Sequence, residues 1–117
     1  MKIKKVVVIG SGTMGSGISA QIANAGIPVT LLDLPSSAGN RNEIAENAKE
    51  KILKSKPPLL FEKENIKLIN AGNIEDDFNL VSEADWIVEA VVERVNIKHN
   101  IYQKIESVRK KESIISS

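Results

Sequence analysis

A glycine pattern near the start of the chain most constrains its fold. Residues 10–15 have the pattern Gly-x-Gly-x-x-Gly and follow the β-branched run at residues 6–9. Such a run is typical of a strand buried on both faces, as in parallel sheets. Apolar residues then recur at helical spacing up to a helix-ending Gly26; they are Met14, Ile18, Ile22 and Ala25. This order of strand, glycine turn and helix is the context of a dinucleotide-binding loop.

The glycine pattern assigns a separate task to each of its glycines. Gly10 permits the tight turn, Gly12 lets the backbone approach a diphosphate, and Gly15 lets the helix pack close to the strand. The amino terminus of the helix then offers free N–H groups and a partial positive charge to an anion. We therefore expect Gly10, Gly12, Thr13, Met14 and Gly15 to bind the cofactor.

An acidic residue at the end of the next predicted strand completes the pattern. Asp33 lies eighteen positions after Gly15, where an acid accepts hydrogen bonds from the adenosine ribose. Leu34 and Pro35 follow it, so no basic neighbour would neutralise a 2′-phosphate, which favours NAD over NADP. A P-loop is excluded because Ser16 stands where that motif requires lysine. The simpler alternative is a glycine turn beside a solvated acid.

The rest of the chain alternates between predicted strands and helices. We expect a helix that starts at a capping box formed by Asn40 and Glu43, with Ile44, Ala48 and Ile52 on its buried face. Strands are expected at residues 29–33, 67–71, 86–92 and 113–116, a turn at 72–73, and helices at 76–83 and 95–110. Alternation of this kind predicts an α/β fold: a Rossmann-type doubly wound parallel sheet of about five strands in three α/β/α layers. The expected strand order is 3-2-1-4-5, within a single domain at residues 1–117.

Composition excludes several classes of function. The chain has no cysteine, so it forms no disulfide and no thiolate metal site, and we expect no metal. The formal net charge of +1 gives no indication of a nucleic-acid partner. The apolar run after the first lysines is too short for a signal peptide, and no run approaches the ~20 residues that a membrane helix needs. We therefore expect a soluble, cytoplasmic protein.

Longer stretches of the sequence resemble one enzyme family. The extended glycine segment at residues 8–18 and residues 23–26 and 29–33 are similar to the L-3-hydroxyacyl-CoA dehydrogenases. More diagnostic is Ala-Asp-Trp-Ile-Val-Glu-Ala-Val-Val-Glu at residues 84–93, followed by Ile97-Lys98, which resembles the family's fourth strand and the turn after it. The ending Ile-Ile-Ser-Ser resembles its fifth strand. The resemblance implies the amino-terminal NAD-binding domain of an enzyme of fatty-acid β-oxidation.

The resemblance also implies roles for individual residues. Those expected to line the nicotinamide ribose are Ala90, Val91, Val92 and Glu93. Lys98 would reach the same ribose or a nearby phosphate, although Glu93 and Lys98 could also be ordinary solvated residues of a helix start. Lys54 and Lys56 are candidates for the phosphates of coenzyme A. Their alternative role is a favourable interaction with the end of the helix dipole.

The catalytic residues implied by the family have no counterpart in this sequence. These enzymes use a His–Glu pair, a serine and an asparagine, and the family's Asn-Thr-Ser sequence would follow the last residue, Ser117. His99 is the only histidine, and we interpret it as an exposed helix residue because no position of the catalytic pair matches it. We therefore expect these 117 residues to bind NAD(H) without catalysing the reaction. Acyl-CoA would bind only in a complete enzyme with its helical substrate and dimerisation domain.

Two other classes of protein share the glycine pattern. One is a regulatory NAD-sensing module, and the other is the cofactor domain of a different hydroxy-acid dehydrogenase. The stretch at residues 85–98 argues against the first.

A fifth strand at the sheet edge would leave unpaired backbone groups, so we expect a homo-oligomer through this edge, an exchanged carboxyl terminus, or low solubility.

Overall fold

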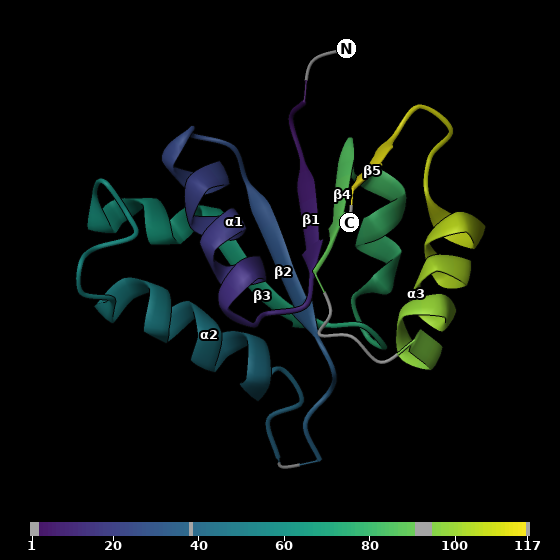
Figure 1. Cartoon of the computed structure of the whole chain (residues 1–117), viewed down its shortest axis with the longest axis horizontal. Helices are drawn as coiled ribbons and strands as arrows, with labels where there is room; N and C mark the ends of the chain where they lie inside the picture. Colours follow the sequence, from purple (N-terminus) through teal and green to yellow (C-terminus); the bar gives the residue numbers. More distant parts are fainter. Residues whose placement is uncertain (1–2, 38, 91–94, 117) are drawn as a thin grey trace.

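The computed structural model describes residues 3–37, 39–90 and 95–116. Its centre is a five-stranded parallel sheet in the order β3-β2-β1-β4-β5, which confirms the predicted order (Figure 1). β1 occupies the middle of this sheet and β5 one of its edges. The strands are β1 (Val6–Ile9), β2 (Val29–Asp33), β3 (Ile69–Asn73), β4 (Trp86–Glu89) and β5 (Ile114–Ser116).

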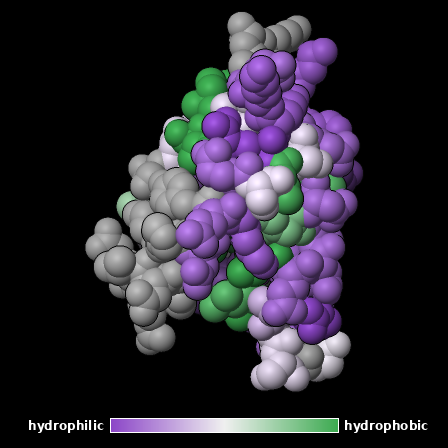
Figure 2. Space-filling model, turned by 90° about the vertical axis from the view of Figure 1, so that its right-hand side faces the viewer, coloured by the Kyte–Doolittle hydropathy of each residue, from purple (hydrophilic) through white to green (hydrophobic). Residues whose placement is uncertain are grey.

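Helices cover both faces of the sheet and form the outer layers of a three-layer α/β/α domain (Figure 1). One face packs against α1 (Thr13–Asn24) and α2 (Glu43–Lys54), and the other against η2 (Phe78–Glu83) and α3 (Val95–Val108). A further 3₁₀ helix, η1 (Lys63–Leu68), precedes β3. Hydrophilic side chains cover much of the side on which α3 lies, with hydrophobic areas between them (Figure 2).

Alternation along the central strand explains why the β-branched run lies there. Val6 and Val8 pack into the cluster under α1 and α2, whereas Val7 and Ile9 pack into the cluster under η2 and α3. All four side chains are buried. Since both faces of the strand are covered, every position favours an apolar residue, and the sequence shows a continuous run instead of alternation.

The end of α1 has the predicted glycine stop and a second anchor. Gly26 has a φ of +81°, the left-handed conformation that ends many helices. Asn24, the last helical residue, donates through Nδ2 to the carbonyl of Leu59 (3.0 Å) and accepts from the backbone N–H of Phe61 (2.9 Å). The segment between α2 and η1 is therefore fastened to the end of α1.

Several local predictions from the sequence are wrong. The capping box does not form, because α2 begins at Glu43 after the N-cap residue Asn42, and the Asn40 side chain accepts instead from the Asn42 N–H (3.0 Å). The strand expected at residues 67–71 and the turn at 72–73 are replaced by β3, which runs through Asn73. The helix expected at 76–83 is the shorter 3₁₀ helix η2, and the strand expected at 86–92 ends at Glu89. Ile44, expected on the buried face of its helix, is 40% exposed.

The edge strand β5 has the position that the sequence analysis predicted. Its neighbour on one side is β4, and its residue Ile114 is 45% exposed. Association through this edge stays a prediction.

In the described part of the chain no helix is long and apolar enough to cross a membrane, and no group of acidic or histidine side chains could hold a metal ion.

An acidic residue joins three segments at the amino end of the sheet. Asp85, just before β4, accepts from the backbone N–H groups of Lys4 (2.9 Å) and Lys5 (3.1 Å) and pairs with the Lys110 ammonium group. The hydrogen bond from Lys110, followed by the one from the Lys4 N–H, lowers the pKa of Asp85 from 3.8 to about 2. Asp85 thus ties β1 and the segment before β5 to the start of β4.

Replacing Asp85 with asparagine is expected to lower the free energy of unfolding at pH 7. The pKa of Asp85 is lower in the folded state, so its carboxylate stabilises the fold above pH 3.8. This contribution is lost as the pH falls through about 2, where the folded protein also takes up the proton. Urea unfolding of both proteins should be measured between pH 7 and pH 2. The difference between their free energies of unfolding should narrow below pH 3.8. Glu83→Gln, which alters an exposed partner of Lys5, is the control, and parallel curves for wild type and Asp85→Asn would contradict the assignment.

Candidate functional site

The glycine loop lies at the carboxyl end of β1, between the central strand and α1. Gly10 has a φ of +104°, which side-chain-bearing residues rarely adopt, and its N–H donates to the carbonyl of Leu32 (2.7 Å). The backbone then turns away from the sheet, and α1 begins at Thr13. The sharp change of direction that was expected at Gly10 is therefore a feature of the structure.

The first turn of α1 lies almost in contact with this loop. A Cβ atom on Gly15 would be 1.8 Å from the carbonyl oxygen of Gly10 and 2.9 Å from its carbonyl carbon. It would also lie 3.5 Å from the Cβ of Ala90, the residue that follows β4. Only a residue without a side chain fits this position. The loop, the helix start and the end of β4 consequently meet at one point.

The amino terminus of α1 is open to an anion. Its N-cap residue is Gly12, which has no side chain to accept from the first turn, and residues 13–16 include no acid. The first N–H groups of an α-helix have no partner within the helix and carry the positive end of its dipole. Thr13 and Met14 are exposed here. Ser16 donates through its N–H to the Gly12 carbonyl and through its hydroxyl to the Ser11 carbonyl, both at 2.9 Å, which fixes the loop.

Asp33 lies at the end of β2, directly beside the glycine loop. Its Oδ2 accepts from the N–H of Ser11 (2.7 Å) and from the Ser11 hydroxyl, and its Oδ1 accepts from the N–H of Leu34 (2.7 Å). An ionised carboxylate has about four acceptor positions, so these three bonds leave capacity on Oδ1. Asp33 thus holds the loop in place and can still accept from a ligand hydroxyl.

Sequence reasoning missed Ser11 as a member of this site. It was treated as a variable position of the glycine pattern, although its N–H and hydroxyl both donate to Asp33. The available signal was a small hydroxyl residue between two glycines, on a loop that must approach the acid after the second strand. A short donor at this position can bind the acid without obstructing the diphosphate.

A cavity of about 630 Å³ lies between the glycine loop and α2. Its volume is within the range of roughly 300–1,000 Å³ that is usual for small-molecule sites. The loop side contributes Ser11, Gly12, Thr13, Ser16 and Asp33, and the α2 side contributes Ile44, Asn47, Ala48, Lys51, Ile52, Ser55 and Leu59. Most of the α2 residues recur three or four positions apart, so they share one helix face. Sequence analysis found this face but assigned it entirely to the core.

A second cavity, of about 500 Å³, lies at the carboxyl end of α2. Lys54, Lys56 and Lys63 line it, so the two lysines considered for coenzyme A do share a surface with a third. The ammonium group of Lys54 also pairs with Glu50 one helical turn earlier (3.1 Å). Binding of coenzyme A at these lysines stays a prediction.

The residues expected near the nicotinamide lie partly outside the described chain. Ala90 is half-buried, and its N–H donates to the carbonyl of Ile9 (2.8 Å), which places it beside the glycine loop. Val91, Val92 and Glu93 lie outside the described residues. Lys98 and His99 belong to α3, but their side chains are not among those described.

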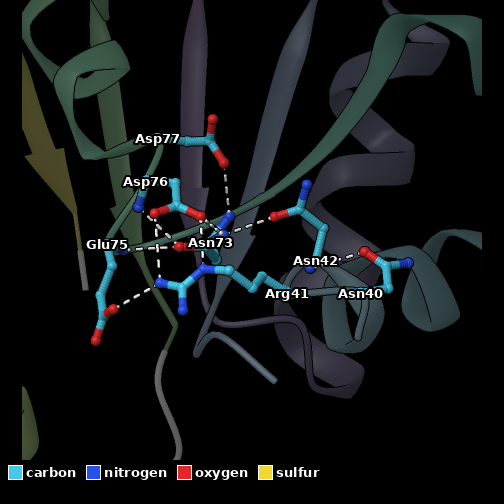
Figure 3. A network of polar contacts seen from close by, with 7 residues as sticks. All are labelled: Asn40, Arg41, Asn42, Asn73, Glu75, Asp76 and Asp77. Atoms are coloured by element: carbon cyan, nitrogen blue, oxygen red, sulfur yellow. Dashed lines mark hydrogen bonds and ion pairs between the residues drawn. The ribbon is translucent and has the colours of Figure 1, made fainter. Parts of the chain in front are cut away.

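A polar network joins the end of β3 and the turn after it to the loop that precedes α2 (Figure 3). Its centre is Asn73, the fully buried last residue of β3, which lies opposite Asp33 in the sheet register. The Asn73 side chain donates to Asn42 Oδ1 (2.7 Å) and Asp76 Oδ2 (3.0 Å), and accepts from the N–H groups of Glu75 (3.0 Å) and Asp76 (2.8 Å). A single buried amide therefore fixes the turn after β3 and its contact with α2.

An arginine on the loop after β2 completes this network. The Nε of Arg41 donates to Asp76 Oδ2 (2.8 Å), and its Nη2 donates to Glu75 Oε2 (2.7 Å) and Asp76 Oδ1 (3.3 Å). The pKa of Asp76 is lowered, chiefly by the hydrogen bond from Arg41 and then by the one from Asn73. The pKa of Arg41 is raised, first by Asp76 and then by Glu75. Both shifts favour the charged forms of Asp76 and Arg41.

Comparisons with known proteins agree on one family. Residues 5–117 match the family model described as 3-hydroxyacyl-CoA dehydrogenase, NAD binding domain. A probable 3-hydroxyacyl-CoA dehydrogenase of Deinococcus radiodurans is 47% identical over 119 aligned positions, which cover 100% of this chain and 34% of the relative. A putative fatty acid oxidation complex trifunctional enzyme of Rickettsia felis is 44% identical over 99% of this chain and 16% of the relative. This chain thus spans about a third or less of the length of these curated relatives.

Solved structures give the same result at lower sequence identity. The crystal structure of Mycobacterium tuberculosis FadB2 superposes with a TM-score of 0.78 and 27% identity, covering 98% of this chain and 40% of that protein. The 3-hydroxybutyryl-CoA dehydrogenase of Escherichia coli superposes with a TM-score of 0.77 and 28% identity, over 98% of this chain and 24% of that protein. The sequence match and the structural match therefore cover the same nearly complete stretch of the chain.

Proposed function

The chain belongs to the 3-hydroxyacyl-CoA dehydrogenase family, as its NAD-binding domain, and we propose that it holds NAD(H) at the carboxyl edge of the sheet for the oxidation of 3-hydroxyacyl-CoA thioesters. The observation that carries the proposal is the junction of the open α1 terminus, the glycine loop and Asp33 beside one cavity. NAD, when bound, supplies the acceptor for a hydride. The chain's own residues bind and orient it.

In this proposal, the diphosphate is held by backbone groups at the start of α1. Gly12 leaves room for its oxygens, and the N–H groups of Thr13 and Met14 lie in the turn that carries the positive end of the helix dipole. Gly15 supports this contact indirectly, since it lets the helix start pack on Gly10. The residues Gly10, Gly12, Thr13, Met14 and Gly15 thus form one preorganised cradle.

The adenosine ribose is assigned to Asp33. Its Oδ1 has acceptor capacity for a ribose hydroxyl, while its Oδ2 stays bonded to Ser11 and keeps the loop in position. Ala90 lies on the other side of the loop, next to Ile9 and Gly15. This position supports a role for Ala90 near the nicotinamide half, together with the residues expected there from the sequence, which are Val91, Val92, Glu93 and Lys98.

The remaining assignments extend to the whole enzyme. We propose acyl-CoA as its substrate, with the coenzyme A phosphates near Lys54 and Lys56 at the second cavity. Each site residue proposed in this chain binds cofactor or substrate, and none is assigned a catalytic role, so that catalysis by these 117 residues alone is not expected. The cytoplasmic location and the lack of a nucleic-acid partner stay predictions from composition.

The proposal predicts that the chain binds NADH at least about tenfold more tightly than NADPH, because Asp33 would repel a 2′-phosphate. Isothermal titration calorimetry of both cofactors against the purified chain is the measurement. Adenosine 5′-monophosphate, which lacks the nicotinamide half, should compete with NADH if the adenosine ribose is the anchored part. Equal affinities for NADH and NADPH would count against the role of Asp33, and an absence of NADH binding would refute the proposed function.

A further inference from the structure

The sequence places no basic residue beside Asp33, but the fold brings Arg41 to the same edge of the sheet and Lys51 of α2 to the cavity that Asp33 lines. The loop after β2 turns back on itself, because the N–H of Ser36 donates to the carbonyl of Arg41 (3.0 Å). Arg41 therefore lies beside Ser36, three residues after Asp33. In Rossmann folds, an arginine near this acid is the group that accommodates a 2′-phosphate in enzymes that use NADP.

Two carboxylates hold this arginine by its side chain. Asp76 accepts from both Nε and Nη2 of Arg41, and Glu75 accepts from Nη2 (Figure 3). The geometry with Asp76 is bidentate, which is the strongest arrangement between a guanidinium and a carboxylate. About half of the Arg41 side chain is exposed to solvent (48%), so it would be accessible to a phosphate if the acids released it.

The position of the two acids is fixed by the sheet and not by chance side-chain contact. The N–H of Ile74 donates to the carbonyl of Asp33 (3.0 Å), so the turn that carries Glu75 and Asp76 starts next to Asp33. The buried side chain of Asn73 accepts from the N–H groups of Glu75 and Asp76 and donates to Asp76. This edge thus presents the carboxylates of Asp33, Glu75 and Asp76 near the Arg41 guanidinium, while the Asp77 carboxylate accepts from the Asn73 N–H.

We propose that Glu75 and Asp76 are specificity determinants of the cofactor site, which hold Arg41 away from a 2′-phosphate and so keep the site selective for NAD. The inference rests on the proposed function, since it concerns the ribose end of the same site. Discrimination then has two parts. Asp33 repels the additional phosphate directly, and the acidic pair occupies the donors that could bind it.

The proposal is tested by releasing Arg41 while Asp33 stays in place. In the double variant Glu75→Gln and Asp76→Asn, the ratio of the NADPH and NADH dissociation constants should fall about tenfold, as expected for a change of charge close to a phosphate at the surface. Adenosine 2′,5′-bisphosphate and adenosine 5′-monophosphate form a second pair of ligands that differ only in the 2′-phosphate. Their ratio should fall by the same factor, independently of the nicotinamide half.

Three further variants separate the arginine from general effects of charge. Adding Arg41→Gln to the double variant should abolish most of the fall in the ratio of the two dissociation constants, because the proposal requires the guanidinium. The pair Glu83→Gln and Glu106→Gln removes the same charge from exposed acids that pair with Lys5 and Arg109, and should leave the ratio unchanged. Glu75→Gln alone changes an exposed side chain (57%) and should give a smaller shift in the same direction, even if the Asp76 change destabilises the fold.

The outcomes distinguish this inference from the proposed function. NADH binding by the wild-type chain decides the function, and its absence would overturn both. With NADH bound normally, an unchanged ratio in both Glu75→Gln and the double variant would overturn the inference. The inference would also be overturned if the ratio fell equally far without Arg41, or if it fell equally far in the control pair. A fall of about tenfold that depends on Arg41 would support it.

Discussion

Replacing Gly15 with alanine is expected to destabilise the domain by about 2–3 kcal/mol, at the upper end of the usual range for a group forced into packed surroundings. The new Cβ would lie 1.8 Å from the Gly10 carbonyl oxygen, and contacts below 3.0 Å essentially never occur for a real Cβ. The two groups must therefore separate by more than about 1 Å, which moves the N–H groups at the start of α1 out of the position proposed for binding the diphosphate. Hydrogen bonds to a charged group contribute about 1.5–3 kcal/mol, so we expect NADH affinity to fall by about 10- to 150-fold. Urea unfolding measures the first effect and calorimetric titration the second.

Gly17 provides the matched control for this substitution. It lies two residues further along the same helix, and a Cβ at this position would have nothing within 4 Å. Gly17→Ala should stabilise the helix by roughly 0.5–1 kcal/mol, since alanine loses less conformational freedom than glycine. NADH affinity should not change in this variant. If Gly15→Ala behaves like Gly17→Ala in both measurements, the close contact between the helix and the loop is not a requirement of the site.

Replacing Asp33 with alanine is expected to weaken NADH binding by about 10- to 150-fold. The range corresponds to the loss of hydrogen bonds to a charged acceptor, which contribute about 1.5–3 kcal/mol. The variant also leaves the N–H and hydroxyl of Ser11 without their carboxylate partner, so the loop loses a support and the ligand loses a contact. Calorimetric titration of NADH against wild type and variant is the measurement.

Two further substitutions separate these contributions. Ser11→Ala removes the hydroxyl donor but keeps the backbone N–H bond to Asp33, so it should weaken NADH binding much less than Asp33→Ala does. Asp33→Asn keeps an acceptor oxygen but removes the charge, and should therefore lie between wild type and alanine. If Asp33→Ala binds NADH as wild type does, the ribose is not held by this residue.

The parts of the fold that follow from one-dimensional patterns could be predicted. The β-branched run at Val6–Ile9 predicted a central strand because only a strand covered on both faces favours apolar residues at every position. The order of strands followed from the alternation of strands and helices together with the glycine loop. The end of the first helix could be predicted from Gly26 because glycine readily adopts the left-handed φ that ends many helices.

Periodicity failed where a helix face serves two purposes. Ile44 was assigned to the buried face of α2, but it is 40% exposed and lines the cavity beside the glycine loop. Met14 fits the helical spacing of α1, yet it lies in the first turn of that helix and is 66% exposed. Spacing identifies which side chains share a face, but not whether protein or a ligand covers that face.

The polar network could not be predicted from the sequence. Asn73 was assigned to a turn because Gly-Asn is a frequent turn dipeptide, whereas it ends β3 and is fully buried. Its partner Asn42 is thirty-one positions earlier, and no local pattern links two polar side chains at that separation. Arg41 was overlooked for the same reason, since only the folded loop pairs it with Ser36 and brings its side chain to Glu75 and Asp76.

The backbone ladder of the sheet continues one residue beyond the strands into the candidate site. The N–H of Gly10 donates to Leu32, that of Ala90 to Ile9, and that of Ile74 to Asp33. The first residue after each of these three strands is therefore held by the sheet itself. We expect these three amides to open only together with the strands of the central layer. Substitutions deep in that layer would consequently weaken ligand binding without altering any residue that contacts the ligand.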